Sequence, residues 1–150
     1  MSADARVQEL GLELPAFPEL PFTPRLVPLL EHGGLAYLSG VGPVGVAGVV
    51  GGDLTVEQGY EAARTTALLA LRRIVDEYGE LDRVARWVKV LGFVRSAPGF
   101  GDQPAVVNGF TDLVVDVYGP ERALCARSAI GVAELPAGIP VEVEAVLALR

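Results

Sequence analysis

The chain has 150 residues, a formal net charge of −7, one cysteine and one histidine. This length suits one domain with a hydrophobic core, while the lone Cys and His exclude an intramolecular disulfide and a Cys/His metal cluster. The acidic balance disfavours nucleic acid as a partner, and the absence of a long apolar run or signal-peptide core predicts a cytoplasmic protein outside the membrane.

The N-terminal part of the chain predicts a segment without regular structure, followed by a hairpin. Residues 1–24 are expected to form an extended, proline-rich segment, and residues 25–150 a single domain. Residues 25–30 and 35–39 flank a turn with two consecutive glycines. Because glycine readily takes the positive φ of a tight turn, a β-hairpin is expected there.

A glycine-rich loop and two helices are expected next. Residues 40–52 lack the Gly-Lys-Ser/Thr ending of a phosphate-binding loop and predict an ordinary loop. Thr55, with a glutamine three residues later, forms a capping-box pattern for a helix that ends at Gly79. Asp102 is placed to cap a second helix, which runs to Tyr118. Both helices have an apolar stripe and are expected to pack on a sheet.

Three further strands complete the pattern. Residues 84–94 are rich in β-branched and aromatic side chains and predict a central strand. Two closing strands lie within residues 126–146, separated by a break at 135–138. The order β-β-α-β-α-β-β predicts an α/β (α+β) fold, a mixed sheet with two helices on one face.

The central strand carries a prediction about assembly. Strict alternation makes both of its faces apolar, with Val84, Val88, Val90 and Val94 on one side and Trp87, Leu91 and Phe93 on the other. Two helices can cover only one face of the sheet, so another subunit is expected to cover the second. The alternative is that the proline-rich N-terminal segment folds over it.

The closing strands hold the charged residues of greatest interest. Alternation places Arg127, Ala129, Gly131 and Ala133 on one face of their strand, and Glu142 and Glu144 on one face of the last. A guanidinium followed by three small side chains is unusual on a strand face and leaves open space beside the arginine. The structural alternative is an ion pair between Arg127 and a glutamate of the last strand.

These residues belong to a recognisable pattern. The stretch ARSAIGVAELPAGIPVEVEA, residues 126–145, resembles the signature of the Rid/YjgF family of reactive-intermediate deaminases. Leu38-Ser39-Gly40, Val107-Asn108 and the strand in 81–96 extend the resemblance. The glycine-rich loop is similar to that of the longer branch, named endoribonuclease or chorismate-mutase-like. The resemblance implies a chorismate-mutase-like fold and a homotrimer with a central barrel and clefts between subunits.

The same resemblance implies a reaction and a set of site residues. The best-understood members of the family hydrolyse 2-imino or 2-enamino acids to a 2-keto acid and ammonia, and the resemblance implies no cofactor and no metal. Arg127 matches the arginine that holds the substrate carboxylate, and Glu142 the glutamate that orients or deprotonates water. The other substrate-binding positions implied are Ser39, Gly40, Asn108 and Ala129.

The chain departs from the family pattern at several cleft positions. Leu26 stands where a tyrosine is typical, Ala129 where cysteine or threonine is common, and Gly131 where an acid is common. Thr111 lies near the position of another aromatic residue. These changes keep the carboxylate anchor but remove polar and aromatic neighbours, so they bear on substrate choice and on catalysis.

Other functions remain alternatives. A non-catalytic trimer that binds small carboxylates fits the same residues. A ribonuclease fits less well, because the net charge is −7 and no His-based acid–base pair is evident. A chorismate mutase needs several cations around a dianion, and only Arg127 is a candidate. Asn108 has a structural alternative, capping or packing within its helix, and Cys125 is expected to be a buried small residue.

Overall fold

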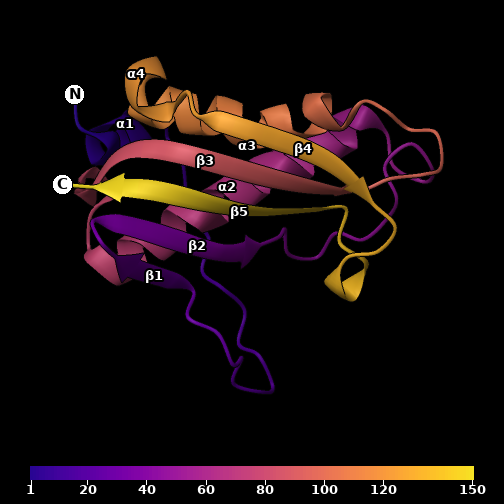
Figure 1. The fold of residues 1–150 in the computed structure, drawn as a ribbon, viewed down its shortest axis with the longest axis horizontal. Helices are drawn as coiled ribbons and strands as arrows, with labels where there is room; N and C mark the ends of the chain where they lie inside the picture. The colour runs from indigo at the N-terminus through magenta and orange to yellow at the C-terminus, as the bar shows by residue number, and fades with distance from the viewer.

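The computed structural model describes residues 1–150 as a five-stranded mixed sheet with two long helices on one face (Figure 1). The strands are β1 (Leu29–His32), β2 (Leu35–Val41), β3 (Val84–Arg95), β4 (Ala126–Val132) and β5 (Val141–Leu149). The helices are α1 (Ala3–Glu9), α2 (Val56–Tyr78), α3 (Gln103–Tyr118) and α4 (Pro120–Ala123), with short 3₁₀ turns at Leu81–Arg83 and Pro136–Gly138. The predicted α/β class with a mixed sheet is confirmed.

The order of the strands places the last strand in the middle of the sheet. The order is β1-β2-β5-β3-β4, and only the β3–β4 pair is parallel. The crossover from β3 to β4 runs through α3, which lies behind β4 in Figure 1, and α4, which lies at the upper edge of the sheet. Strand β4, which carries Arg127, is therefore an edge strand with one side unpaired.

Local signals specify the ends of the two long helices. Thr55 and Gln58 form both hydrogen bonds of the predicted capping box, and Gly79 ends α2 in the left-handed conformation, with φ 79°. Asp102 occupies the N-cap of α3, but its side chain makes no capping hydrogen bond, in contrast to the prediction. Gly119 ends α3 and leads directly into α4.

The alternation predicted for β3 is wrong in its first half. The pairing with β5 shifts register between Val84 and Arg86, and again between Trp87 and Lys89. Each β-bulge adds a residue and reverses the side to which the following side chains point. Trp87 is therefore fully buried under the helices, edge-on to Phe110 at 5.7 Å, whereas Val88 is 39% exposed.

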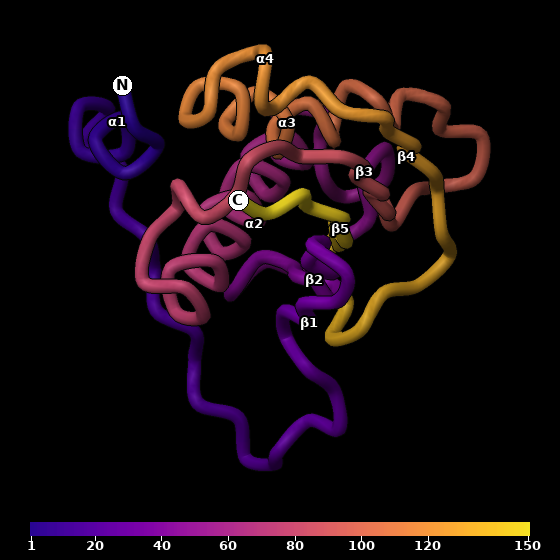
Figure 2. Tube along the Cα trace, turned by 60° about the vertical axis from the view of Figure 1, so that its left-hand side comes forward, coloured from indigo at the N-terminus to yellow at the C-terminus, as the bar shows by residue number.

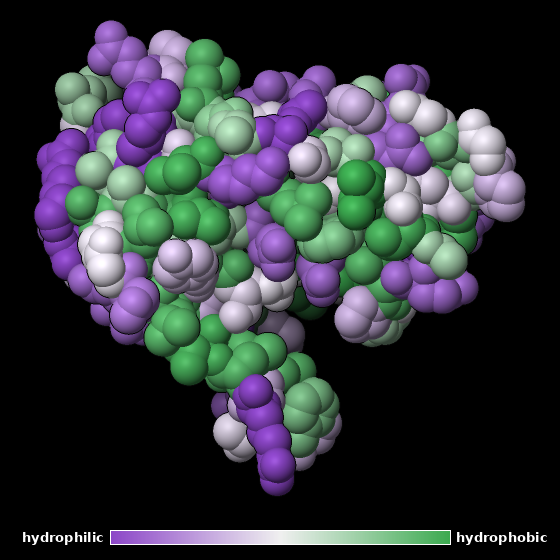
Figure 3. All heavy atoms as spheres, in the orientation of Figure 1, coloured by the Kyte–Doolittle hydropathy of each residue, from purple (hydrophilic) through white to green (hydrophobic).

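The face of the sheet away from the helices is uncovered and partly apolar. Figure 3 shows hydrophobic side chains among charged ones on this face. The exposed apolar side chains of its strands include Leu30, Tyr37 and Ile130. The N-terminal segment does not cover this face, because it runs past α2 on the helix side (Figure 2). Helix α1 contacts α3, and Phe17 stacks on Arg73 of α2. The alternative cover is thus excluded within one chain, and the face remains available to another subunit.

The N-terminal segment is not extended throughout, which corrects the prediction for residues 1–24. Residues 3–9 form α1 because Ser2 caps the helix by accepting from the N–H of Ala5. The Asp4 carboxylate accepts hydrogen bonds from the backbone N–H groups of Leu81 and Asp82. This short helix is therefore held to the 3₁₀ turn before β3.

Asp82 is expected to stabilise this junction in a pH-dependent way. Its carboxylate lies 2.9 Å from Arg122 and accepts the N–H of Ala3. Burial raises the pKa of Asp82, but the hydrogen bond and charge of Arg122 outweigh it, so this pKa lies below its usual 3.8. Asp82→Asn should lower the free energy of unfolding by about 1–3 kcal/mol at pH 7, as measured by urea denaturation.

The pH dependence of this loss follows from the lowered pKa. The stabilisation is present above pH 3.8 and disappears as pH falls through the folded-state pKa, so wild type and variant should converge in acid. Asp76→Asn is the control, because Asp76 pairs with Arg72 on the exposed surface of α2 and should contribute about 0.5 kcal/mol or less. Equal losses for both variants would contradict this assignment.

Candidate functional site

Arg127 lies on the helix-covered face of β4. Its partner in the register with β3 is Val90, which is buried beneath the helices, so the arginine side chain faces α3. There its Nη1 donates to Oδ1 of Asn108 at 2.8 Å and to Oγ1 of Thr111 at 3.0 Å. These acceptors are three residues apart and share one side of α3. Two neutral oxygens thus fix the guanidinium and leave its charge uncompensated.

The other edge of the Arg127 guanidinium has no partner in the chain. Nε and Nη2 make no hydrogen bond, and no carboxylate lies within ion-pair distance. The alternative of an ion pair with Glu142 or Glu144 is therefore not realised within one chain. Two parallel N–H groups without a partner suit a carboxylate, which accepts one with each of its oxygens.

A cavity of about 270 Å³ adjoins this arginine. Its lining residues are Asn108, Thr111, Asp112, Val115, Ala123, Leu124, Cys125 and Arg127. Cys125 is half-buried rather than buried as predicted, and burial raises the pKa of its thiol, which therefore stays protonated near neutrality. Near Arg127 the lining is polar and carries charges of both signs, whereas toward Val115 and Leu124 it is apolar.

The small residues beyond Arg127 do not widen this cavity. Ala129 packs against the hydrophobic core and is not among the lining residues. A methyl group at Gly131 would lie 2.7 Å from Nε2 of Gln103, so the space beside Gly131 is occupied by a side chain of α3. The open space inferred from the alternation thus lies toward Leu124 and Val115, before Arg127 in the sequence.

Glu142, Gly40 and Ser39 form a second group on the uncovered face. Glu142 is paired with Phe93 of β3, and its carboxyl group packs against Gly40, where a methyl would lie 2.9 Å from Cδ. A register shift between β2 and β5 at this position creates the close approach. The hydroxyl of Ser39 donates to the carbonyl of Val27 at 2.7 Å and so holds the segment before β1.

The pKa of Glu142 predicts how its replacement alters stability. Burial, together with repulsion from Glu144, raises the pKa of Glu142 above its usual 4.5. The folded state thus holds a proton that the unfolded state releases, and stability falls as pH rises from 4.5 through the folded pKa. Glu142→Gln should stabilise the protein at pH 7, by less than about 1 kcal/mol because solvent screens the carboxylate, and should have no effect near pH 4.

Thermal unfolding of both proteins at the two pH values measures this effect. Glu144→Gln serves as the matched control, since Glu144 is exposed on the same face of β5. Its replacement removes the repulsion but not the burial, so a smaller gain is expected. A loss of stability at pH 7 for Glu142→Gln would show that the carboxylate makes favourable contacts that outweigh its burial.

The two groups lie on opposite faces of the sheet. Strands β4 and β5 flank β3 on its two sides, and Gly92 pairs with Ala129 and with Val143. The side chain of Arg127 lies on the helix-covered face of the sheet, whereas that of Glu142 lies on the uncovered face. The sheet therefore separates the predicted anchor from the predicted catalytic carboxylate in a single chain, and a site that uses both needs two chains.

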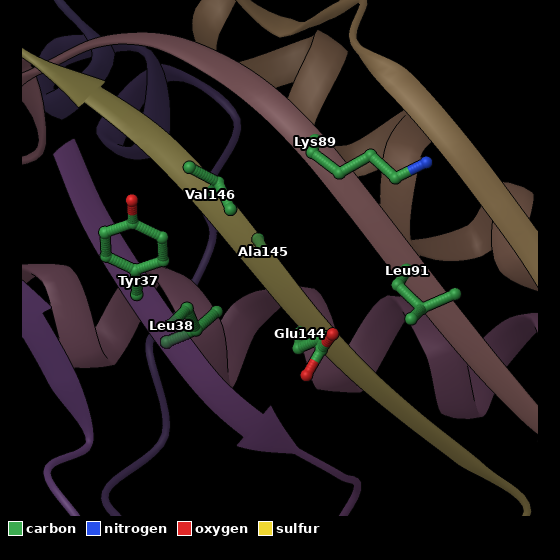
Figure 4. A pocket seen from close by; sticks show the side chains of 7 residues that line it. All are labelled: Tyr37, Leu38, Lys89, Leu91, Glu144, Ala145 and Val146. Atoms are coloured by element: carbon green, nitrogen blue, oxygen red, sulfur yellow. The ribbon is translucent and has the colours of Figure 1, made fainter.

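A smaller cavity of about 130 Å³ lies on the uncovered face (Figure 4). Its polar side chains do not converge, because the ammonium of Lys89 extends toward β4 and donates to Ser128 at 3.2 Å, while Glu144 points away from it. No three His, Cys, Asp or Glu side chains are grouped so that they could hold a metal ion. None of the helices combines the length and apolar character that a membrane crossing requires.

Two residues of the Arg127 cavity had no assigned role in the sequence analysis. Thr111 accepts from Arg127, although it stood out only as a departure from the family pattern. Asp112 lines the cavity and accepts a hydrogen bond from the Tyr60 hydroxyl at 2.8 Å. Their spacing from Asn108, three and four residues along a helix, is the signal that could have identified them.

Comparison with known proteins identifies the family. The endoribonuclease L-PSP family matches residues 20–149. Protein TCP17 of Trypanosoma cruzi is 42% identical over 151 residues, which is 97% of this chain and 93% of the relative. The structure of Atu1372 from Agrobacterium tumefaciens has a TM-score of 0.85 and 33% identity, covering 98% of this chain and 91% of that one.

A more distant structure shares the fold. E. coli TdcF with bound serine has a TM-score of 0.57 and 21% identity, covering 86% of this chain and 91% of that one. The family match over most of the chain, together with 42% identity to a relative of nearly equal length, shows the relationship. The chain therefore belongs to the endoribonuclease L-PSP family, the Rid/YjgF family that its residues 126–145 resemble.

Proposed function

We propose that the protein hydrolyses 2-imino and 2-enamino acids to 2-keto acids and ammonia, at a site formed by two copies of the chain. The observation that carries this proposal is the free Nε and Nη2 edge of Arg127 beside an open cavity. An unpaired guanidinium next to a cavity attracts a small carboxylate strongly, because both hydrogen bonds are charge-assisted.

The substrate class follows from this anchor and from the shape of the cavity. A 2-imino acid presents its carboxylate beside the C=N carbon, so a carboxylate held by Arg127 places the reactive carbon close by. Asn108 and Thr111 hold the guanidinium without neutralising it. E. coli TdcF carries bound serine, whose α-carboxylate is the same chemical group, and this supports a carboxylate ligand in the family.

Glu142 is the proposed catalytic residue. Water adds to the C=N carbon, the carbon–nitrogen bond then breaks, and ammonia leaves with a 2-keto acid. Glu142 takes a proton from the attacking water and gives it to the nitrogen. It then passes the proton of the new hydroxyl to the same nitrogen, as the C=O bond forms and ammonia leaves. Burial, together with repulsion from Glu144, raises the pKa of Glu142 above that of an ordinary carboxyl group, which makes the carboxylate a stronger base. General acid–base help of this kind contributes about 10²–10⁴-fold in rate.

A cyclic homotrimer is the proposed assembly. It would cover the apolar side chains of the open face, such as Leu30, Tyr37 and Ile130. It would also bring Glu142 of one copy to the Arg127 cavity of the next, which one chain cannot do because the sheet separates them. Three equivalent clefts would result from the rotational symmetry. The proposed compartment is the cytoplasm.

A coupled assay tests the activity. An amino-acid oxidase generates 2-imino acids of varied side chain, and semicarbazide trapping follows their loss with and without the protein. Acceleration by wild type that Arg127→Ala abolishes supports the deaminase. No acceleration with any side chain, in a protein confirmed as a folded oligomer, overturns it.

A binding protein without turnover is the second candidate. The observation in its favour is the hydroxyl of Ser39, which donates to Val27 and is therefore already engaged. With fewer free polar groups around the cleft, the arginine can still bind a carboxylate, but fewer side chains are free to take part in catalysis. This candidate predicts thermal stabilisation by 2-keto acids, lost in Arg127→Ala, with no release of ammonia.

A further inference from the structure

The cavity beside Arg127 holds a second charged residue, Asp112, that the proposed reaction does not use. Asp112 lies on α3 between the two ends of the cavity. At one end Asn108 and Thr111 hold the arginine, and the other end is lined by Val115. Leu124, at the apolar end, is exposed to 62% and has no apolar cover of its own. A ligand whose carboxylate binds Arg127 would pass Asp112 if its side chain fills the cavity toward this apolar end.

The Asp112 carboxylate is held in place but not neutralised. The Tyr60 hydroxyl of α2 donates to its Oδ2 at 2.8 Å. The hydrogen bond to Asp112, together with burial, raises the pKa of Tyr60, so the tyrosine stays a protonated donor at neutral pH. No cation forms an ion pair with Asp112, and Arg127 is the only cation that lines the cavity. A fixed negative charge thus lines the cavity between Arg127 and its apolar end.

We infer that Asp112 selects substrates by the charge of their side chains. The site takes 2-imino acids with aliphatic side chains and rejects those with a second carboxylate. This inference rests on the proposed function, since it names the substrate class of the same cavity. Like charges in one small pocket near a protein surface change an affinity by about tenfold or more. Val115, Ala123 and Leu124 favour a neutral aliphatic group in the same place.

The test compares two imines with two variants. Imines of leucine and glutamate are generated by oxidases that accept the parent amino acids, and kcat/KM is measured for each. Wild type should favour the leucine imine, and Asp112→Asn should reduce that preference about tenfold by improving use of the glutamate imine. Asp116→Asn is the matched control, one turn along α3 and outside the cavity, and should leave the preference unchanged.

Binding measurements separate failure of this inference from failure of the proposed activity. The affinities of 4-methyl-2-oxopentanoate and 2-oxoglutarate are measured by calorimetry for the same three proteins. The wild-type preference for the first compound, reduced about tenfold in Asp112→Asn, supports charge selection even if no imine is hydrolysed. An unchanged ratio in Asp112→Asn overturns the inference, whether or not the protein is a deaminase.

Discussion

Replacing Gly109 with alanine is expected to lower the free energy of unfolding by about 3 kcal/mol or more. Gly109 lies where α3 crosses α2, and an added methyl would lie 2.0 Å from the carbonyl oxygen of Tyr60 and 3.2 Å from the backbone nitrogen of Arg64. Backbone atoms cannot move aside as a side chain can, so the two helices would have to separate. That separation would also move Tyr60 away from Asp112.

Urea denaturation of Gly109→Ala and Gly59→Ala measures this effect. Gly59 is also buried within a helix, but a methyl there would meet only side chains, those of Val106 and Val50 at 3.1 Å. Alanine gains about 1 kcal/mol over glycine in a helix, which offsets the crowding, so Gly59→Ala should stay within about 1 kcal/mol of wild type. Equal stability of the two variants would contradict the close helix crossing at Gly109.

Replacing Arg127 with lysine is expected to lower kcat/KM for imino acids by about 10²-fold or more, because each charge-assisted hydrogen bond contributes about 1.5–3 kcal/mol. The guanidinium uses Nη1 for Asn108 and Thr111, and its second edge, which has no partner in the chain, is the edge proposed to bind the substrate carboxylate. An ammonium group keeps the charge but cannot present a fixed pair of N–H groups to a carboxylate while it contacts both side chains of α3.

Steady-state kinetics and thermal unfolding together identify the cause of that loss. Arg83→Lys is the control, since Arg83 pairs with Glu31 at the far edge of the sheet and is outside the cavity. Both lysine variants should unfold near the wild-type temperature, and only Arg127→Lys should lose activity. Turnover within a few-fold of wild type in Arg127→Lys would mean that bidentate binding of the carboxylate is not required.

Features set by neighbours in the sequence were predictable. Thr55 and Gln58 are three residues apart, and the reciprocal hydrogen bonds of their capping box need no distant partner. The same holds for Gly79, which takes the left-handed conformation at the end of α2. The signature at residues 126–145 identified both the fold and the family, because it combines several residues at a fixed spacing.

Features set by pairing between distant segments were not predictable. The β-bulges that bury Trp87 and expose Val88 arise from the register with β5, about sixty residues later. The same pairing places β5 between β2 and β3, so Glu142 does not lie beside the strand of Arg127. The space at Gly131 is filled by Gln103, which comes from α3. In each case the deciding contact depends on the tertiary fold.

Mixing two inactive variants tests the composite site most directly. Arg127→Ala and Glu142→Gln are co-expressed and assayed for imine hydrolysis beside each variant alone. If Arg127 of one copy works with Glu142 of its neighbour, random assembly leaves about a quarter of the clefts with both residues intact, and about a quarter of wild-type activity should return. A mixed sample as inactive as either variant alone would contradict a site shared between two copies.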